Sequence, residues 1–127
     1  MQIIDSLSQI GHNYDALFVD LWGCVHNGIT PYPEAVSALQ AYRAGGGAVV
    51  LVTNAPRPRS GVQDHLTQMG LPQDCWDTIA TSGDSARVAL FSGVVGEKVW
   101  FIGEDRDAPF LEPPKLLPNP TRIELVP

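Results

Sequence analysis

Two apolar segments that each end in polar side chains restrict the fold of this chain more than any other feature. Leu17–Val19 runs directly into Asp20, and Ala48–Val52 runs into Thr53 and Asn54. Short continuous apolar runs of this kind are typical of buried strands in a parallel sheet. The sequence therefore predicts two buried strands, each of which presents polar groups at its carboxyl end.

The segment between the two predicted strands has the pattern of a helix. Apolar residues recur at helical spacing through Pro33–Ala44, and Gly45–Gly47 ends the run. A strand, a helix and a second strand joined in this order almost always form a right-handed unit with parallel strands. We therefore expect Asp20 and Thr53 at the same edge of one sheet, where ligands of open α/β sheets bind.

Asp20 has two interpretations from its position alone. It is a candidate for a binding or catalytic residue, because it follows a strand at the edge where ligands bind. An aspartate after a strand also commonly caps the next turn through its side chain. The local pattern leaves both interpretations open.

Further strands and helices are predicted beyond the second strand. The spacing of apolar residues predicts helices over 60–69 and 85–91, with short strands at 77–80 and 98–102. This alternation of strands and helices is typical of an α/β protein with a parallel sheet.

Composition and charge exclude several classes of function. The formal net charge is −6 with only eight basic residues, which argues against nucleic-acid binding, because that needs a positive patch. The chain has no apolar stretch of membrane length and no signal-peptide pattern, so we expect a soluble, cytoplasmic protein without a membrane partner. Cys24 and Cys75 form neither a disulfide framework nor a metal-binding spacing.

Four short motifs stand in a fixed order along the chain. An aspartate followed by glycines and an apolar residue, a Pro-x-Ala-x-x-x-Leu helix start, an apolar strand ending in Thr-Asn and a Thr-Ser-Gly stretch lie at 20–28, 33–39, 49–54 and 81–83. Together they resemble the N-terminal half of a haloacid dehalogenase-like hydrolase, in the branch that includes sugar-phosphate, nucleotide and 4-nitrophenyl phosphatases. The resemblance spans roughly residues 15–105.

The resemblance implies a three-layer α/β/α Rossmann-like core that is only partly present here. We expect a partial parallel sheet over residues 1–108 and no cap domain. Residues 109–127 form a proline-rich tail, at the point where the cap or the remaining core would begin, and we expect this tail to be extended or irregular.

The resemblance also implies a Mg²⁺-dependent phosphatase that acts on a small phosphorylated substrate through an aspartyl-phosphate. Asp20 is then the nucleophile and a metal ligand, and Trp22 lends its backbone carbonyl to Mg²⁺. Gly23, Thr53 and Asn54 are then the residues that bind the phosphate.

One position departs from the family pattern. The second aspartate of the first motif, which serves the family as general acid and base, is Trp22 here. Such help is typically worth about 10²- to 10⁴-fold in rate, and an indole cannot supply it. His26 could take its place. Because the downstream lysine and acidic pair of the family have no counterpart either, we expect this chain alone to be inactive or weakly active.

Two other functions stay open. An aromatic residue two positions after the aspartate also occurs in the metal-free dehalogenases of 2-haloacids, so carbon–halogen cleavage is conceivable. The chain could also be a non-catalytic relic that serves as a binding or regulatory fragment.

The other polar residues are expected to have structural roles. We expect His26 to be an exposed loop histidine. Arg57 and Arg59 are the cations nearest to the Thr-Asn motif in sequence, and we expect solvated loop side chains there rather than phosphate ligands. Asp84 is predicted to be a helix N-cap.

The resemblance also predicts a partner. In the family fold the strand that carries Asp20 is central, and the segment without a counterpart here supplies its neighbour. Leu17–Val19 would then be an exposed edge, which invites pairing with another chain. We expect either self-association through this edge or a partner chain that carries the remaining half.

Overall fold

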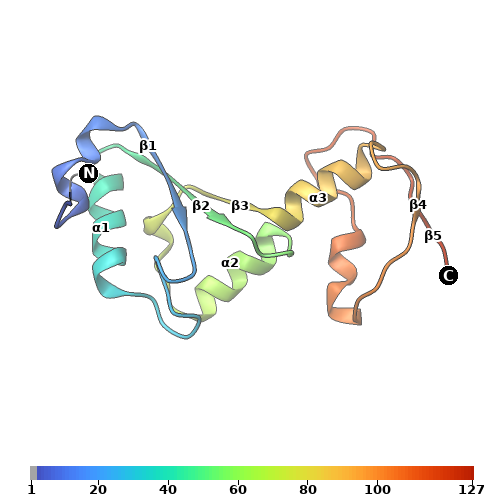
Figure 1. Cartoon of the computed structure of the whole chain (residues 1–127), viewed down its shortest axis with the longest axis horizontal. Helices are drawn as coiled ribbons and strands as arrows, with labels where there is room; N and C mark the ends of the chain where they lie inside the picture. Colours follow the sequence, from blue (N-terminus) through green and yellow to red (C-terminus); the bar gives the residue numbers. More distant parts are fainter. Residues whose placement is uncertain (1–2) are drawn as a thin grey trace. The chain divides into compact units, whose positions relative to one another are not determined.

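The structure, a computed structural model, describes residues 3–127. It divides into two compact units, one formed by the residues up to Thr53 together with Gln63–Ala80, the other by Asn54–Val62 and Thr81–Pro127. The helices and strands, labelled in Figure 1, are α1 (Pro33–Ala44), α2 (Arg59–Gln68), α3 (Ser82–Phe91), β1 (Ala16–Asp20), β2 (Ala48–Thr53), β3 (Thr78–Thr81), β4 (Lys98–Val99) and β5 (Glu124–Leu125).

A three-stranded sheet with the order β1-β2-β3 forms the centre of the first unit. β1 runs parallel to β2, with Ala16 opposite Ala48 and Asp20 opposite Val52. α1 connects these two strands, as the strand-helix-strand pattern predicted. The α/β class with a partial parallel sheet is thus confirmed, and Asp20 and Thr53 are the last residues of their strands, at the same end of the sheet.

The core of the first unit is built around one face of β2. Val49 and Leu51 are fully buried, and Leu66 of α2 and Leu39 of α1 are nearly so. Residues alternate between the two faces of a strand, and β2 shows this alternation, because Val52 is exposed. Burial of a Val or Leu side chain stabilises a fold by roughly 1.5–3 kcal/mol, so β2 is the main apolar anchor of the sheet.

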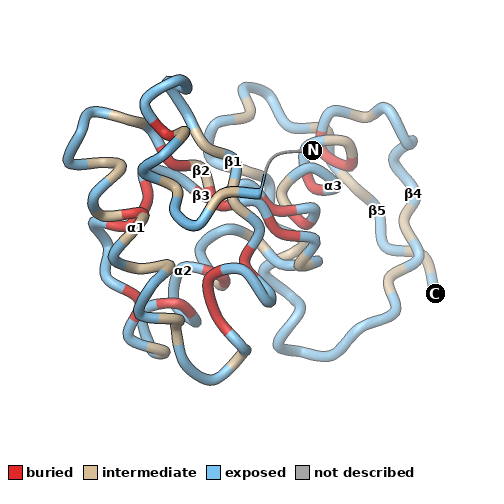
Figure 2. The backbone as a smooth tube through the Cα atoms, turned by 60° about the vertical axis from the view of Figure 1, so that its left-hand side comes forward, coloured by how far each residue is buried: buried red, intermediate tan, exposed pale blue. Residues whose placement is uncertain are grey.

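The prediction that β1 is a buried strand is wrong. Its residues alternate between exposed and partly buried positions (Figure 2), and Phe18 is 78% exposed. The physical reason is that β1 lies at the edge of the sheet and pairs only with β2 among the described residues. Buried apolar side chains follow β1, at Leu21 and Val25.

α3 begins three residues earlier than the predicted helix. Thr81 is the N-cap, because its hydroxyl oxygen accepts a hydrogen bond from the backbone N–H of Asp84 at 2.9 Å. Asp84 lies in the first turn rather than at the cap, so the prediction of its role is wrong. A threonine before Ser-Gly satisfies one of the free N–H groups at the start of the helix.

The second unit contains a small sheet of its own. β4 and β5 pair in parallel, with Lys98 opposite Glu124 and Val99 opposite Leu125. The predicted strand at 98–102 is therefore confined to its first two residues. The proline-rich tail is not irregular throughout, because it supplies β5 and the end of a 3-10 helix at Asp105–Leu111.

Candidate functional site

Asp20 is the last residue of β1, and its side chain is exposed. One carboxylate oxygen, Oδ1, accepts a hydrogen bond from the backbone N–H of Leu21 at 2.8 Å. This is the local turn contact that the sequence allowed as one interpretation. The carboxylate nevertheless stands exposed at the carboxyl end of a parallel strand, where ligands of such sheets bind.

The turn after Asp20 depends on Gly23. Its φ of 74° lies in the left-handed region that glycine tolerates best. Its N–H donates to the carbonyl of His26 at 2.9 Å, and the carbonyl of Leu21 accepts from the N–H of Val25 at 2.9 Å. The Gly23 amide is thus used within the turn, and the predicted role of Gly23 in phosphate binding would need the freedom of its backbone rather than this N–H.

Trp22 turns its side chain back onto the loop. The indole lies over Gly28, where an added Cβ would come within 2.4 Å of the ring carbon Cη2. Gly28 also has a φ of 92°. The ring remains 65% exposed. At the position where the family pattern has an acid, this chain therefore has an aromatic ring that packs on the turn.

His26 is buried, so the prediction of an exposed loop histidine is wrong. Only 3% of the residue is exposed, and its Nδ1 accepts a hydrogen bond from the N–H of Gly28 at 2.9 Å. Burial, followed by the neighbouring charge of His65, lowers the pKa of His26, and the charge of Asp20 opposes this shift. The imidazole is therefore held neutral near pH 7, with its proton on Nε2, because Nδ1 is an acceptor.

Thr53 ends β2 one residue beyond the partner of Asp20, and it is buried, with 7% of the residue exposed. Asp20, Trp22, Gly23 and Thr53 thus all belong to the first unit, whereas Asn54 is exposed and begins the second. The structure brings Asp20, Trp22, Gly23 and Thr53 to the end of the sheet where the strands have their carboxyl ends.

The Thr-Ser-Gly stretch holds the segment that follows the Thr-Asn motif. Within the second unit, the hydroxyl of Ser82 donates to the carbonyl of Asn54 at 2.8 Å, and the hydroxyl of Thr81 donates to that of Arg57 at 2.8 Å. Gly83 has no room for a side chain, because an added Cβ would lie 2.4 Å from the Arg57 carbonyl oxygen. Motif order alone did not reveal this supporting role.

Arg59 does not serve as a free cation. Its Nε donates to Asp84 at 2.7 Å, and Nη1 of Arg87 donates to the other oxygen of the same carboxylate at 3.0 Å. Burial acts to raise the pKa of Asp84, but the hydrogen bonds from the two arginines outweigh it and bring the pKa below its usual range. Arg59 is therefore a partner in an ion pair, where the sequence predicted a solvated side chain.

The oxygen atoms near the turn are of the kind that binds a hard cation. Asp20 offers a carboxylate, and no hydrogen bond within residues 3–127 occupies the carbonyl of Trp22. Mg²⁺ prefers oxygen ligands and usually keeps several waters, so two protein oxygens can suffice when a phosphate completes the shell. No group of three or more metal-ligating side chains occurs within the described part of the chain.

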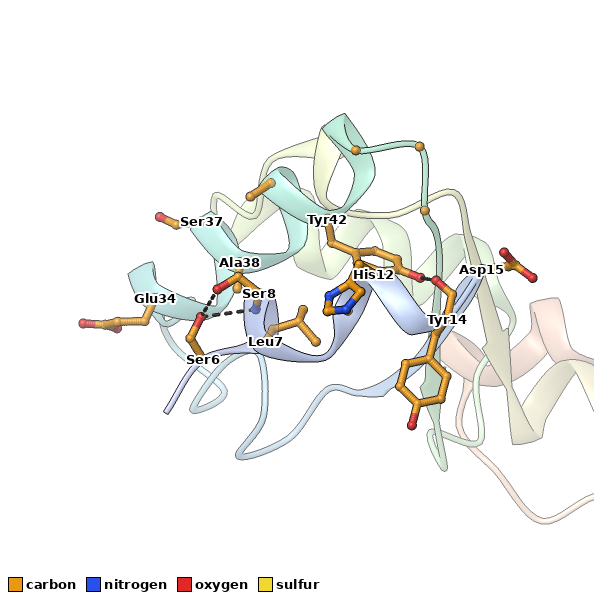
Figure 3. A pocket seen from close by; sticks show the side chains of 15 residues that line it. Ser6, Leu7, Ser8, His12, Tyr14, Asp15, Glu34, Ser37, Ala38 and Tyr42 are labelled. Carbon is orange, nitrogen blue, oxygen red and sulfur yellow. Dashed lines mark hydrogen bonds between the residues drawn. The ribbon is translucent and has the colours of Figure 1, made fainter. Parts of the chain in front are cut away.

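A pocket of about 740 Å³ lies elsewhere in the first unit. It is lined by residues that precede the strands, such as Asp15 before β1 and Gly47 before β2, and by α1. In Figure 3 the hydroxyl of Tyr42 reaches the carbonyl of Tyr14, a hydrogen bond of 2.6 Å. The pocket thus lies at the amino ends of the strands, whereas Asp20 lies at their carboxyl ends.

The fold and this edge define an α/β protein that presents a carboxylate at the end of an edge strand of a parallel sheet. The chain belongs to the haloacid dehalogenase-like hydrolases, because the sequence pattern of that family matches residues 17–113. A comparison with curated proteins gave no match. No helix in residues 3–127 combines the length and the apolar composition needed to span a bilayer.

A solved structure agrees with this assignment. The chain is similar to a hydrolase of the haloacid dehalogenase-like family from Brucella suis 1330, with 36% sequence identity and a TM-score of 0.83. The match covers 98% of this chain and 43% of that one. The present chain therefore spans less than half the length of that hydrolase.

Proposed function

We propose that this chain carries the nucleophile half of a Mg²⁺-dependent phosphatase that acts on a small phosphorylated metabolite. The observation that carries the proposal is the parallel register of β1 and β2, in which Asp20 lies opposite Val52 and Thr53 follows directly. A carboxylate and a hydroxyl at the same sheet edge suit a phosphoryl group, with one to attack it and the other to hold it.

In the proposed reaction, a carboxylate oxygen of Asp20 attacks phosphorus, and the bond from phosphorus to the leaving oxygen breaks with its electron pair. The product is an aspartyl-phosphate, which water then hydrolyses to restore Asp20. The hydroxyl of Thr53 donates to a phosphoryl oxygen, and the resemblance assigns Asn54 the same task. Asp20 and the carbonyl of Trp22 would hold Mg²⁺, which when bound supplies positive charge against the phosphoryl oxygens.

The proposed reaction lacks an acid for the leaving group. The indole of Trp22 packs on Gly28, and it cannot transfer a proton near neutral pH. His26 accepts a hydrogen bond at Nδ1 and is buried. Because general acid–base help is worth about 10²- to 10⁴-fold, we propose that the isolated chain forms the covalent intermediate slowly and is at most weakly active.

A binding experiment tests the proposal without turnover. We expect beryllium fluoride, which mimics a phosphoryl group on a carboxylate, to bind the chain in the presence of Mg²⁺ and to give a bound ¹⁹F signal. Asp20→Asn should abolish the signal. Asp15→Asn removes an exposed carboxylate at the other end of the same strand and should leave the signal unchanged.

The same variants serve in a Mg²⁺-dependent assay with 4-nitrophenyl phosphate. Weak hydrolysis that disappears in Asp20→Asn and survives in Asp15→Asn would support the proposal. Equal hydrolysis by the wild type and Asp20→Asn would contradict it, since the activity would then come from another group or a contaminant.

A second candidate function follows from Trp22. A binding or regulatory fragment needs no acid and base, and Trp22, whose indole packs on Gly28, stands where the family pattern has the acid. Binding of a phosphorylated ligand with no covalent adduct and no hydrolysis would favour this function.

A further inference from the structure

His26 joins three parts of the turn that follows Asp20. Its backbone N–H donates to the carbonyl of Leu21 at 3.2 Å, and its own carbonyl accepts from Gly23 at 2.9 Å. Its side chain accepts the N–H of Gly28 at 2.9 Å through Nδ1. Three positions of the turn therefore hydrogen-bond to the buried His26: Leu21 at its start, Gly23 with its left-handed backbone, and Gly28 at its end.

The imidazole ring also touches the residue whose carbonyl is a proposed metal ligand. The ring of His26 meets that of Trp22 edge-on, with centroids 5.6 Å apart and an interplanar angle of 63°. The ring of His65 also meets that of His26 edge-on, with centroids 6.5 Å apart and an interplanar angle of 84°. Trp22 in turn rests on Gly28, the residue that donates to His26. These contacts close a ring of interactions around the turn.

We propose that His26 is the positioning residue of the site, acting as a hydrogen-bond acceptor that fixes the turn bearing the Trp22 carbonyl beside Asp20. The inference rests on the proposed function, because it assigns that carbonyl a ligand. It differs from a role as substitute acid, because it uses the lone pair of Nδ1, which accepts from the N–H of Gly28, and requires no transfer of a proton.

Two substitutions separate an acceptor from a proton carrier. In His26→Asn, the side-chain oxygen can take the place of Nδ1 and accept from Gly28, but no group remains that exchanges protons near neutral pH. In His26→Leu, the ring volume is largely kept and the acceptor is lost, which leaves the N–H of Gly28 without its partner. A positioning role is therefore rescued by asparagine, whereas a role in proton transfer is not.

We expect His26→Leu to weaken Mg²⁺ binding by about tenfold or more, as measured by titration calorimetry on the full chain. Exchange of the Gly28 amide hydrogen, followed by NMR, should accelerate by a similar factor. His26→Asn should stay within about threefold of the wild type in both measurements. His12→Asn is the matched control, because it changes an exposed histidine of another segment, and it should alter neither.

Equal losses in the asparagine and leucine variants would overturn the proposal, and so would a leucine variant that behaves like the wild type. If His26→Leu fails to fold, His26→Gln replaces it, because glutamine presents its oxygen farther along the side chain than Nδ1. Asparagine and glutamine variants that behave alike would then overturn the proposal.

The amide exchange requires no metal, so it distinguishes the two proposals. A wild-type chain that binds no Mg²⁺ at millimolar concentration contradicts the proposed function and, with it, the assignment of a metal ligand to this turn. Fast exchange at Gly28 in the wild type, with Mg²⁺ bound, contradicts only the role of His26.

Discussion

The contact between Trp22 and Gly28 makes the turn after Asp20 sensitive to a single methyl group. We predict that Gly28→Ala lowers the free energy of unfolding by about 1–3 kcal/mol, because the left-handed backbone disfavours alanine and the new Cβ meets the indole. Urea unfolding followed by circular dichroism measures this loss.

A second glycine provides the control. Gly61 lies within α2, and an added Cβ there meets nothing within 4 Å. Because alanine is a better helix former, Gly61→Ala should raise the free energy of unfolding by about 0.5–1 kcal/mol. Similar losses in both variants would show that the indole and the left-handed backbone are not the cause.

Asp77 makes the stability of the first unit dependent on pH. Hydrogen bonds from the Arg43 side chain, and then one from the Val49 backbone, lower the pKa of its carboxyl from 3.8. A carboxyl whose pKa is lowered by folding stabilises the fold above its unfolded value and loses this contribution as the pH falls through the folded value. The contribution of Asp77 is therefore complete near pH 7 and is lost below about 3.8.

We predict that Asp77→Asn has a lower melting temperature than the wild type at pH 7 and that the difference shrinks as the pH is brought to 3. Thermal unfolding at both values measures it. The substitution Asp105→Asn, in a carboxylate on the surface of the second unit, is the control. A difference that stays constant between pH 7 and pH 3 would refute the link to this carboxyl.

Single residues also show where sequence reasoning stops. The position of Asp20 was predictable, because a strand–helix–strand unit fixes the edge at which each strand ends. The burial of His26 was not, because a loop residue has no periodicity and its environment depends on how the chain returns through Gly28. Nor did the sequence show that Gly23 would use its own amide within the turn.

Elements were predictable where one segment carries enough pattern by itself. α1 and β2 agree with prediction, since their apolar spacing and the glycines between them are local signals. The apolar run of β1 predicted a buried strand, whereas the resemblance predicted an exposed edge strand, and the structure confirms the second prediction, because burial depends on the neighbours of a strand. The pairing of β4 with β5 joins two-residue strands far apart in the sequence, and no local pattern predicts such a contact.

The start of α3 gives a test at the level of elements. We predict that Thr81→Ala lowers the free energy of unfolding by about 1–2 kcal/mol, because its hydroxyl both accepts from Asp84 and donates to the carbonyl of Arg57. Thr81→Ser keeps the hydroxyl and should lose less than half as much. Chemical unfolding measures both, and equal losses would show that the methyl group, rather than the cap, matters.

On the scale of the whole molecule, the edge strand β1, which pairs only with β2 within residues 3–127, is the feature most open to a partner. An edge strand offers unpaired N–H and C=O groups to another chain, and Phe18 lies exposed in its middle. We propose that the chain associates with itself through this edge, and that a partner supplying a strand, such as one carrying the remaining half of the fold, would compete for it.

We predict that sedimentation velocity at micromolar concentration shows dimers or larger species. Phe18→Lys should shift the distribution toward monomer, because a charged side chain on an edge strand opposes pairing. Val94→Lys places the same charge on another exposed apolar position and should have no such effect. A compact monomer for the wild type at every concentration would contradict the proposal.

The two units are interleaved along the chain, and this governs how the protein can be made and dissected. The chain passes from one unit to the other between residues 53 and 54, 62 and 63, and 80 and 81, so the second and third crossings fall inside α2 and β3. During synthesis, neither unit is complete until the ribosome has passed residue 80. No single proteolytic cut and no shortened gene can therefore release either unit intact.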